Sequence, residues 1–174
     1  MDALRSRLMG VTALAARYCS AVENAADYGR LEFIIEILGY LPKLYVEFSD
    51  PDMELGESDE YYSGYVDEDY YESVRRKMEM LFGEYDVFLE TFEEDMKYSD
   101  TPVSASISES LADIFQALYN FISIVKDSEG DNVVGAYTEC RENFASYWSQ
   151  TLCNVMRALN NLRYNSNLTS DTDE

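Results

Sequence analysis

Apolar residues recur at intervals of three and four positions along most of the chain, which is the spacing of one face of an α-helix. Between Leu4 and Val22 the apolar positions step by four, three, four, three and four. No segment alternates between apolar and polar residues over the length of a strand. The pattern predicts five helices, at about residues 2–27, 30–48, 67–82, 107–126 and 132–164.

Proline, glycine and serine mark where the predicted helices bend, end or begin. Pro42 lacks a backbone N–H and is expected to bend or restart the second helix. Gly83 interrupts the third helix, and a short helix carrying Val87 and Phe88 is expected after it. The sequence Ser-Ile-Ser-Glu at 106–109 has the pattern of a capping box that starts the fourth helix.

Short connections favour antiparallel neighbours, so the predicted fold class is all-α. The expected architecture is an antiparallel up-and-down helix bundle of five long or medium helices plus one or two short ones. We expect a single domain over residues 1–164, with the last helix at its centre because that helix has the widest apolar arc. An acidic loop is expected at about 49–65 and a disordered polar tail at 165–174.

The composition excludes several kinds of chemistry. The 174 residues include no histidine, which excludes His–Asp and Cys–His catalysis, histidine-ligated zinc and the histidine-containing di-iron sites of helical bundles. Cys19, Cys140 and Cys153 lie among apolar residues at helical spacing, so we expect small core residues rather than reactive thiols. Free cysteines favour a cytoplasmic location. The apolar N-terminal stretch keeps its helical spacing, unlike a signal peptide, and no apolar run reaches the length of a membrane span.

The charge of the chain is −21, and about half of it lies in one segment. Residues 47–72 contain eleven acidic residues, five tyrosines and no lysine or arginine. Such a surface repels nucleic acid and anionic lipid. It is typical either of a solvated loop or of a docking surface for a basic partner. A calcium loop starting at Asp50 fails, because Leu55 replaces the required glycine and Tyr61 the bidentate glutamate.

We therefore place the candidate docking site in this acidic, tyrosine-rich segment. Its tyrosines would supply contact area, and its carboxylates would steer a basic protein toward the surface. The candidate binding residues are Asp59, Glu60, Tyr61, Tyr62, Tyr65, Asp67 and Asp69. A second group of acids flanks an apolar helix face and is interpreted as solvated rather than metal-binding. That group is Asp86, Glu90, Glu93 and Glu94.

Two charged residues stand within otherwise apolar helical stretches. Asp113 lies in the fourth predicted helix and Arg157 in the fifth. We expect them to form a buried or half-buried ion pair that fixes the register of the two helices. The functional alternative is a polar pocket in the same region. Its lining would be Asn143, Trp148, Asn154, Arg157 and Asn160.

Three elements of the sequence resemble an uncharacterised bacterial family. Residues 111–118, LADIFQAL, are similar to that family's L-A-D-I-Y-Q-D-L element. The N-F, Y-W and M-R-A-L groups within 143–159 are similar to its N-F…W-G…A-L-R-A-L-H element, and 41–45 to its early L-P-containing helix. Ser149 and Asn160 depart from the family's glycine and histidine. The resemblance implies a helical fold and a bacterial cytoplasmic setting, and it implies no reaction because none is established for the family.

Together these observations predict a non-enzymatic binding or adaptor protein that docks a basic protein through its acidic, tyrosine-rich surface. One alternative is an acidic inhibitor that imitates nucleic acid or neutralises a basic toxin. The other is a small-ligand binder or enzyme that uses the polar pocket near Arg157. We expect no catalytic residue, metal or cofactor, and the sequence leaves the oligomeric state open.

Overall fold

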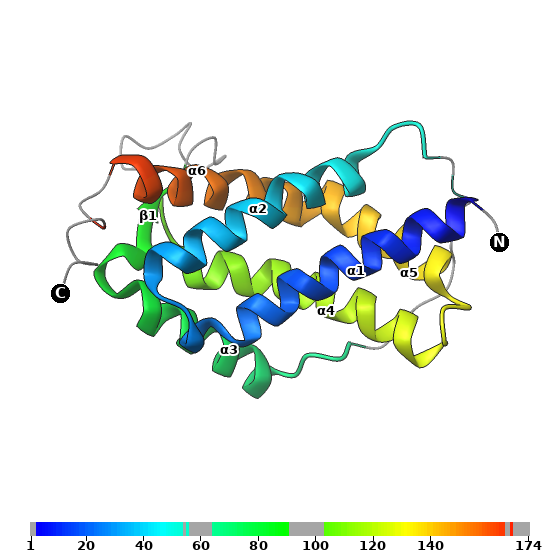
Figure 1. The fold of residues 1–174 in the computed structure, drawn as a ribbon, viewed down its shortest axis with the longest axis horizontal. Helices are drawn as coiled ribbons and strands as arrows, with labels where there is room; N and C mark the ends of the chain where they lie inside the picture. Colours follow the sequence, from blue (N-terminus) through cyan, green and yellow to red (C-terminus); the bar gives the residue numbers. More distant parts are fainter. Residues whose placement is uncertain (1–2, 54, 56–63, 91–102, 166–167, 169–174) are drawn as a thin grey trace.

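A computed structural model of the chain describes residues 3–53, 55, 64–90, 103–165 and 168. Within these residues the chain forms five helical rods and one small sheet (Figure 1). The helices are α1 (Ala3–Glu23), α2 (Arg30–Ser49), α3 (Glu68–Phe82), α4 (Ile107–Asp127), α5 (Val133–Asn143) and α6 (Ser149–Asn165). A π-helical segment, Phe144–Trp148, joins α5 to α6 as one rod. The strands are β1 (Val87–Leu89) and β2 (Ser104–Ser106).

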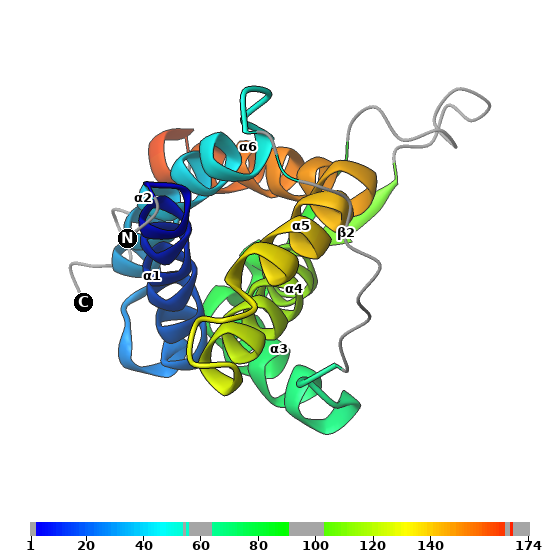
Figure 2. The ribbon, with the colours of Figure 1, turned by 90° about the vertical axis from the view of Figure 1, so that its right-hand side faces the viewer.

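Successive rods run in opposite directions, so the neighbouring helices pack antiparallel (Figure 1). α4 packs against α1, α3, α5 and α6, while α2 packs against α1 and α6. Seen from the end of the bundle, α1 and α2 lie on one side and α3, α4 and α5 on the other (Figure 2). The predicted all-α bundle is confirmed. The helix at the centre of the bundle is α4 and not, as the sequence predicts, the last helix. α4 buries the largest share of its length, because eleven of its 21 residues are buried.

Side-chain caps fix the starts of the two helices that border the candidate site. The Asp67 carboxylate accepts the Tyr70 backbone N–H at 2.8 Å and caps α3. The Ser106 hydroxyl accepts the Glu109 backbone N–H at 2.9 Å and caps α4, as the capping-box pattern predicts. Each cap satisfies an N–H that has no partner inside its helix, a contribution of about 1 kcal/mol.

An aromatic cluster joins α2, α4, α5 and the π-helical segment in the core. Phe48 stacks on Tyr137 with ring centroids 5.2 Å apart and meets Trp148 edge-on at 5.1 Å. Phe121 and Phe144 complete the cluster. Aromatic pairs of this kind add about 0.5–1.5 kcal/mol each beyond the area they bury. Trp148 is the single tryptophan and is fully buried, so its fluorescence reports on this core.

The prediction of a short helix around Val87 is wrong. After α3 the chain makes a 3-10 turn, Gly83–Asp86, and then pairs as β1 with β2, with Val87 opposite Ser106. The buried Asp86 carboxylate accepts the Ser108 backbone N–H at 2.8 Å and the Ser108 hydroxyl at 2.6 Å. This contact fastens Asp86 to the N-terminal turn of α4, where N–H groups without a partner inside the helix favour a negative charge. The tertiary contact therefore overrides the local helical pattern.

Two expectations about single residues also change. Cys19 and Cys140 are buried as predicted, but Cys153 is exposed on α6. Leu168, within the predicted tail, is 2% exposed and belongs to the core, so the domain reaches past residue 164. The predicted acidic loop, the rest of the tail, Glu93 and Glu94 lie wholly or largely outside the described residues. In the part of the chain that the structure describes, no helix is both long and apolar enough to cross a bilayer.

Candidate functional site

The described end of the acidic segment packs along α4. Asp59, Glu60, Tyr61 and Tyr62 lie outside the described residues, whereas Tyr65, Asp67 and Asp69 are described and exposed. The Tyr65 backbone N–H donates to the side-chain oxygen of Asn120 at 2.7 Å. The Asp127 carboxylate near the Tyr65 hydroxyl raises the pKa of that hydroxyl. The backbone of Tyr65 is therefore held against α4 at Asn120.

Asp113, on α4, is the centre of a second group of polar contacts. Its carboxylate accepts the Tyr71 hydroxyl of α3 at 2.6 Å and the Tyr147 hydroxyl of the π-helical segment at 2.9 Å. Burial and these hydrogen bonds raise the pKa of Tyr147 to about 12 and raise the pKa of Tyr71 as well. Asp113 thus ties three elements together through two protonated tyrosines.

The expected ion pair between Asp113 and Arg157 is not formed between these two described residues. Arg157 is exposed and donates to the backbone carbonyl of Leu89 at the end of β1. The reason lies in helix geometry. Tyr147 is the residue of its rod that reaches Asp113, and Arg157 follows ten residues later, which is about 15 Å further along a helix. Asp113 cannot reach both.

The alternative, a polar pocket around Arg157, stays a prediction, and the described residues expected to line it differ in exposure. Trp148 and Asn154 are buried, whereas Asn143, Arg157 and Asn160 are exposed. Two of the predicted residues do line a groove, but in separate parts of it. Asp113 borders one pocket and Asn143 borders the next.

Both pockets lie between α4 and the rod formed by α5, the π-helical segment and α6, and we call the two together the α4 groove. On α4, its lining positions are 109, 110, 113, 117, 120, 121 and 124, which step by one, three or four and so form a single stripe. Because the rod runs antiparallel to α4, its lining residues follow in the reverse order, from 151 back to 136. The two pockets therefore occupy successive turns of the same helices.

The first pocket, the Asp113 cleft, has a volume of about 270 Å³ and is rich in hydroxyl groups. β2 and Glu90 contribute to its lining. Its described lining is Glu90, Ser104, Ala105, Ser106, Glu109, Ser110, Asp113, Tyr147 and Thr151.

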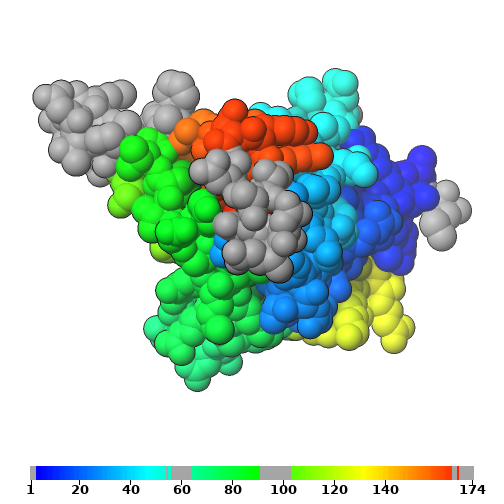
Figure 3. Space-filling model, turned by 60° about the vertical axis from the view of Figure 1, so that its left-hand side comes forward, coloured from blue at the N-terminus to red at the C-terminus, as the bar shows by residue number. Residues whose placement is uncertain are grey.

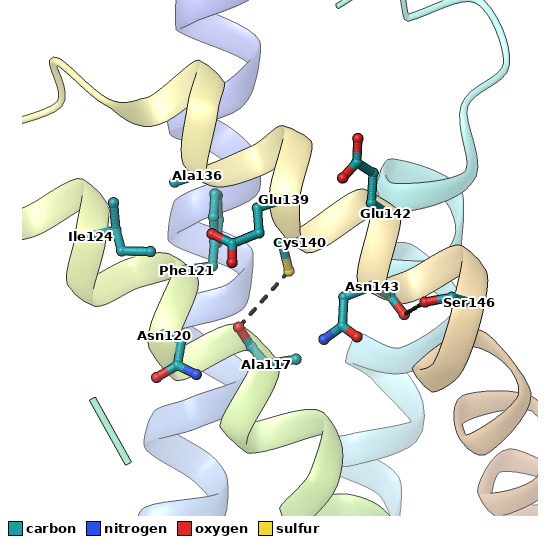
Figure 4. A pocket seen from close by; sticks show the side chains of 10 residues that line it. All are labelled: Ala117, Asn120, Phe121, Ile124, Ala136, Glu139, Cys140, Glu142, Asn143 and Ser146. Carbon is teal, nitrogen blue, oxygen red and sulfur yellow. Dashed lines mark hydrogen bonds between the residues drawn. The ribbon is translucent and has the colours of Figure 1, made fainter. Parts of the chain in front are cut away.

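The second pocket, the Glu139 pocket, has a volume of about 420 Å³ and combines an apolar floor with polar edges (Figure 4). Its described lining is Ala117, Asn120, Phe121, Ile124, Ala136, Glu139, Cys140, Glu142, Asn143 and Ser146. The Cys140 thiol lies 3.9 Å from the Ala117 carbonyl oxygen, to which it donates. Burial raises the pKa of this thiol, which keeps it protonated and unsuited to act as a nucleophile.

The groove is strongly acidic. Five carboxylate side chains line it, and no lysine or arginine does so among the described residues. The acids are Glu90, Glu109, Asp113, Glu139 and Glu142. Glu139 is half-buried, and burial raises its pKa, with the nearby Glu142 carboxylate raising it further. In the described part of the chain, no group of three or more acidic or cysteine side chains is arranged to hold a metal ion.

The profile of the family described as "domain of unknown function (DUF5063)" matches residues 4–165. The chain belongs to the DUF5063 family. A similar structure is the crystal structure of protein BF1032 from Bacteroides fragilis, with 30% sequence identity and a TM-score of 0.74. That match covers 90% of this chain and 91% of BF1032. Among curated proteins, no relative of this DUF5063 chain matches significantly.

The sequence did not single out most of the groove in this DUF5063 member. Asn120, Glu139 and Glu142 carry no motif, and each resembles an ordinary surface residue of an amphipathic helix. The available signal is the pair of small residues, Ala117 and Ala136, within apolar stripes of two helices. Small side chains leave space between packed helices, but the position of that space becomes visible only once the helices are paired.

Proposed function

We propose that this DUF5063 chain is a non-enzymatic binding protein that holds a basic segment of a partner protein in the α4 groove. The observation that carries the proposal is the lining of the groove, with five carboxylates and no described lysine or arginine. A chain of charge −21 attracts a basic partner from a distance. The groove then offers that partner fixed carboxylates between rigid helices.

The position of the acidic segment supports the same proposal. Tyr65 and Tyr71, from the described part of that segment, bond to Asn120 and Asp113 on α4. The segment that the sequence analysis selected thus borders the groove. Tyrosine supplies contact area at small entropic cost, which suits a binding surface.

The groove favours this proposal over imitation of nucleic acid. A mimic presents carboxylates along an exposed ridge, spaced like phosphates. Asp113 and Glu139 are half-buried between two helical rods, and Asp113 is held by two tyrosines, whereas Glu109 and Glu142 are exposed at the rim. A recessed acidic groove is better suited to an extended basic peptide than to the flat surface of a nuclease or repressor.

We also propose a bacterial cytoplasmic setting. Two observations support it. The three cysteines are free, as expected in a reducing compartment. The similar protein BF1032 comes from a bacterium.

A peptide-binding measurement tests the proposed function. The probe is a fluorescein-labelled, amidated nonapeptide of alternating alanine and lysine, and the readout is fluorescence anisotropy at 50 and 200 mM salt. We expect binding that weakens with salt, because the contacts are electrostatic. The double variant Glu109→Gln/Asp113→Asn removes two charges from the Asp113 cleft, and we expect it to weaken binding about three- to tenfold, the scale of two ion pairs near a surface.

The matched control is Glu32→Gln/Glu84→Gln, which removes the same charge at two exposed positions that do not line the groove. We expect this control to bind the peptide within twofold of the original chain. Equal weakening by both double variants would show non-specific attraction to an acidic protein and would contradict the proposal.

A further inference from the structure

The Glu139 pocket has a shape and chemistry that the rest of the groove lacks. Its floor is apolar and is formed by Phe121, Ile124 and Ala136. Figure 4 shows the Glu139 carboxylate and the Asn143 amide lying between the ribbons of α4 and α5. The pocket is therefore amphipathic, with an apolar base and hydrogen-bond acceptors above it.

Glu139 is a carboxylate of this pocket that has no described counter-charge. It is half-buried, and its pKa is raised by burial and by Glu142. No described lysine or arginine forms an ion pair with it, although other acids of the chain do have such partners, as Glu72 and Glu79 have with Arg75. A desolvated carboxylate without a counter-charge is unfavourable for the fold. A cation that entered the pocket would remove this penalty.

We propose that the Glu139 pocket receives an arginine side chain of the basic segment, an inference that rests on the proposed function. The aliphatic stem of an arginine covers an apolar floor while its charged head stays near polar groups. Its planar guanidinium donates in several directions at once. It can therefore bond both to the Glu139 carboxylate and to the side-chain oxygen of Asn143, which lie on the same wall of the pocket.

Arginine fits this pocket better than lysine for a further reason. A guanidinium is more weakly hydrated than an ammonium group, so it enters a half-enclosed pocket at a smaller desolvation penalty. A lysine ammonium is compact and strongly hydrated. It is better suited to the Asp113 cleft, where hydroxyl groups of serine, threonine and tyrosine surround the carboxylates.

Three peptides that differ at one position test the inference. Each is the labelled alanine–lysine nonapeptide with arginine, lysine or citrulline at its centre. Citrulline has nearly the shape of arginine and no charge. We expect the arginine peptide to bind about five- to tenfold more tightly than the citrulline peptide and more tightly than the lysine peptide, because a desolvated charge pair is stronger than an exposed one.

The variant Glu139→Gln assigns this preference to the pocket. We expect the ratio of arginine to citrulline affinity to fall to within twofold of one. The melting temperature should not decrease, because the variant removes an uncompensated charge. Ala117→Leu fills the pocket from the α4 side and should remove the same preference, while Glu32→Gln should preserve it.

The outcomes separate the two proposals. If the peptides bind and the Glu109→Gln/Asp113→Asn variant weakens them, but Glu139→Gln leaves the arginine preference intact, the pocket assignment is wrong and the proposed function stands. If none of the three peptides binds at 50 mM salt, both are wrong. Equal affinities for the arginine and citrulline peptides would also overturn the pocket assignment.

Discussion

Asp86 and Glu139 both lie against α4, and their surroundings differ in almost every respect. Asp86 is 6% exposed, and its two carboxylate oxygens accept two hydrogen bonds from Ser108 at the start of the helix. Glu139 is half-buried beside the middle of the helix, close to Glu142, and pairs with no described cation. In the space-filling view, the green segment that contains α3 and β1 lies beside the blue surface of α1 and α2 (Figure 3).

The difference separates a carboxylate that stabilises the fold from one that weakens it. A buried carboxylate with all of its bonds made contributes to folding, and removing it leaves a buried N–H without a partner. A desolvated carboxylate without a partner is retained at the expense of stability, as is common at binding sites. The following variants test this contrast, from the largest expected effect to the smallest.

Asp86→Ala should cause the largest loss of stability. The variant removes the carboxylate that accepts two hydrogen bonds from Ser108, and it leaves the buried Ser108 N–H without a partner. The free energy of unfolding should therefore fall by about 2–4 kcal/mol. Urea unfolding followed by Trp148 fluorescence measures the change. The control Glu84→Ala, an exposed neighbour in the same turn, should change stability by less than about 0.5 kcal/mol. Similar losses in both variants would refute a structural role specific to Asp86.

Asp113→Ala should have an intermediate effect. The variant leaves the Tyr71 and Tyr147 hydroxyls without their acceptor, so the free energy of unfolding should fall by about 1–2 kcal/mol. Tyr147 is 53% exposed and can turn to water, so most of the loss should come from Tyr71. A double-mutant cycle with Tyr71→Phe measures this pair, and a coupling energy near zero would contradict the assigned hydrogen bond.

Alkaline pH should destabilise the fold through its tyrosines. Burial first, and then hydrogen bonds to Glu36 and Asp113, raise the pKa of Tyr40 and of Tyr147 to about 12. An unfolded tyrosine ionises near pH 10. Between these values the unfolded chain loses protons that the folded chain retains, so the free energy of unfolding should fall as pH rises from 10 to 12. Urea titrations at several pH values in this range measure how steeply the free energy of unfolding falls with pH. The fall should be shallower in the double variant Tyr40→Phe/Tyr147→Phe. An unchanged slope in that variant would show that other groups govern the alkaline transition.

Glu139→Gln should have the smallest effect on stability and the opposite sign. Because the pKa of Glu139 is raised in the folded state, its charged form is unfavourable there. The variant should therefore raise the free energy of unfolding at pH 7 by a few tenths of a kcal/mol. The advantage should disappear as pH falls and Glu139 becomes protonated in both states. A clear loss of stability at pH 7 would place Glu139 with Asp86 as a structural residue.

The helices could be predicted from the sequence because their information is local. Three- and four-residue apolar steps, Gly83 after α3 and the Ser106 cap of α4 all act within a few positions. The strand at Val87 could not be predicted, because Asp86 is fixed by Ser108, 22 residues away. For the same reason Asp113 was recognised as unusual while its partners were not. Tyr71 lies on α3 and Tyr147 in the π-helical segment, and only the packed bundle brings them together.

The acidic groove could be predicted from the sequence only in part. The excess charge of residues 47–72 is evident in the sequence, and Tyr65 and Tyr71 connect that segment to α4. Glu139 and Glu142 come from a segment with no net charge, residues 131–164, so no charge count identifies them. Their position depends on the pairing of α5 with α4.

A single titration tests the central claim, that the α4 groove is the place where a cationic segment binds. Backbone amide signals of the ¹⁵N-labelled chain are followed by NMR while the arginine-centred nonapeptide is added at 150 mM salt. The account predicts that the largest shifts cluster on residues 109–124 of α4 and 136–151 of the facing rod, with small shifts on α2. Shifts of similar size spread over α2 and the rest of the acidic surface would contradict it.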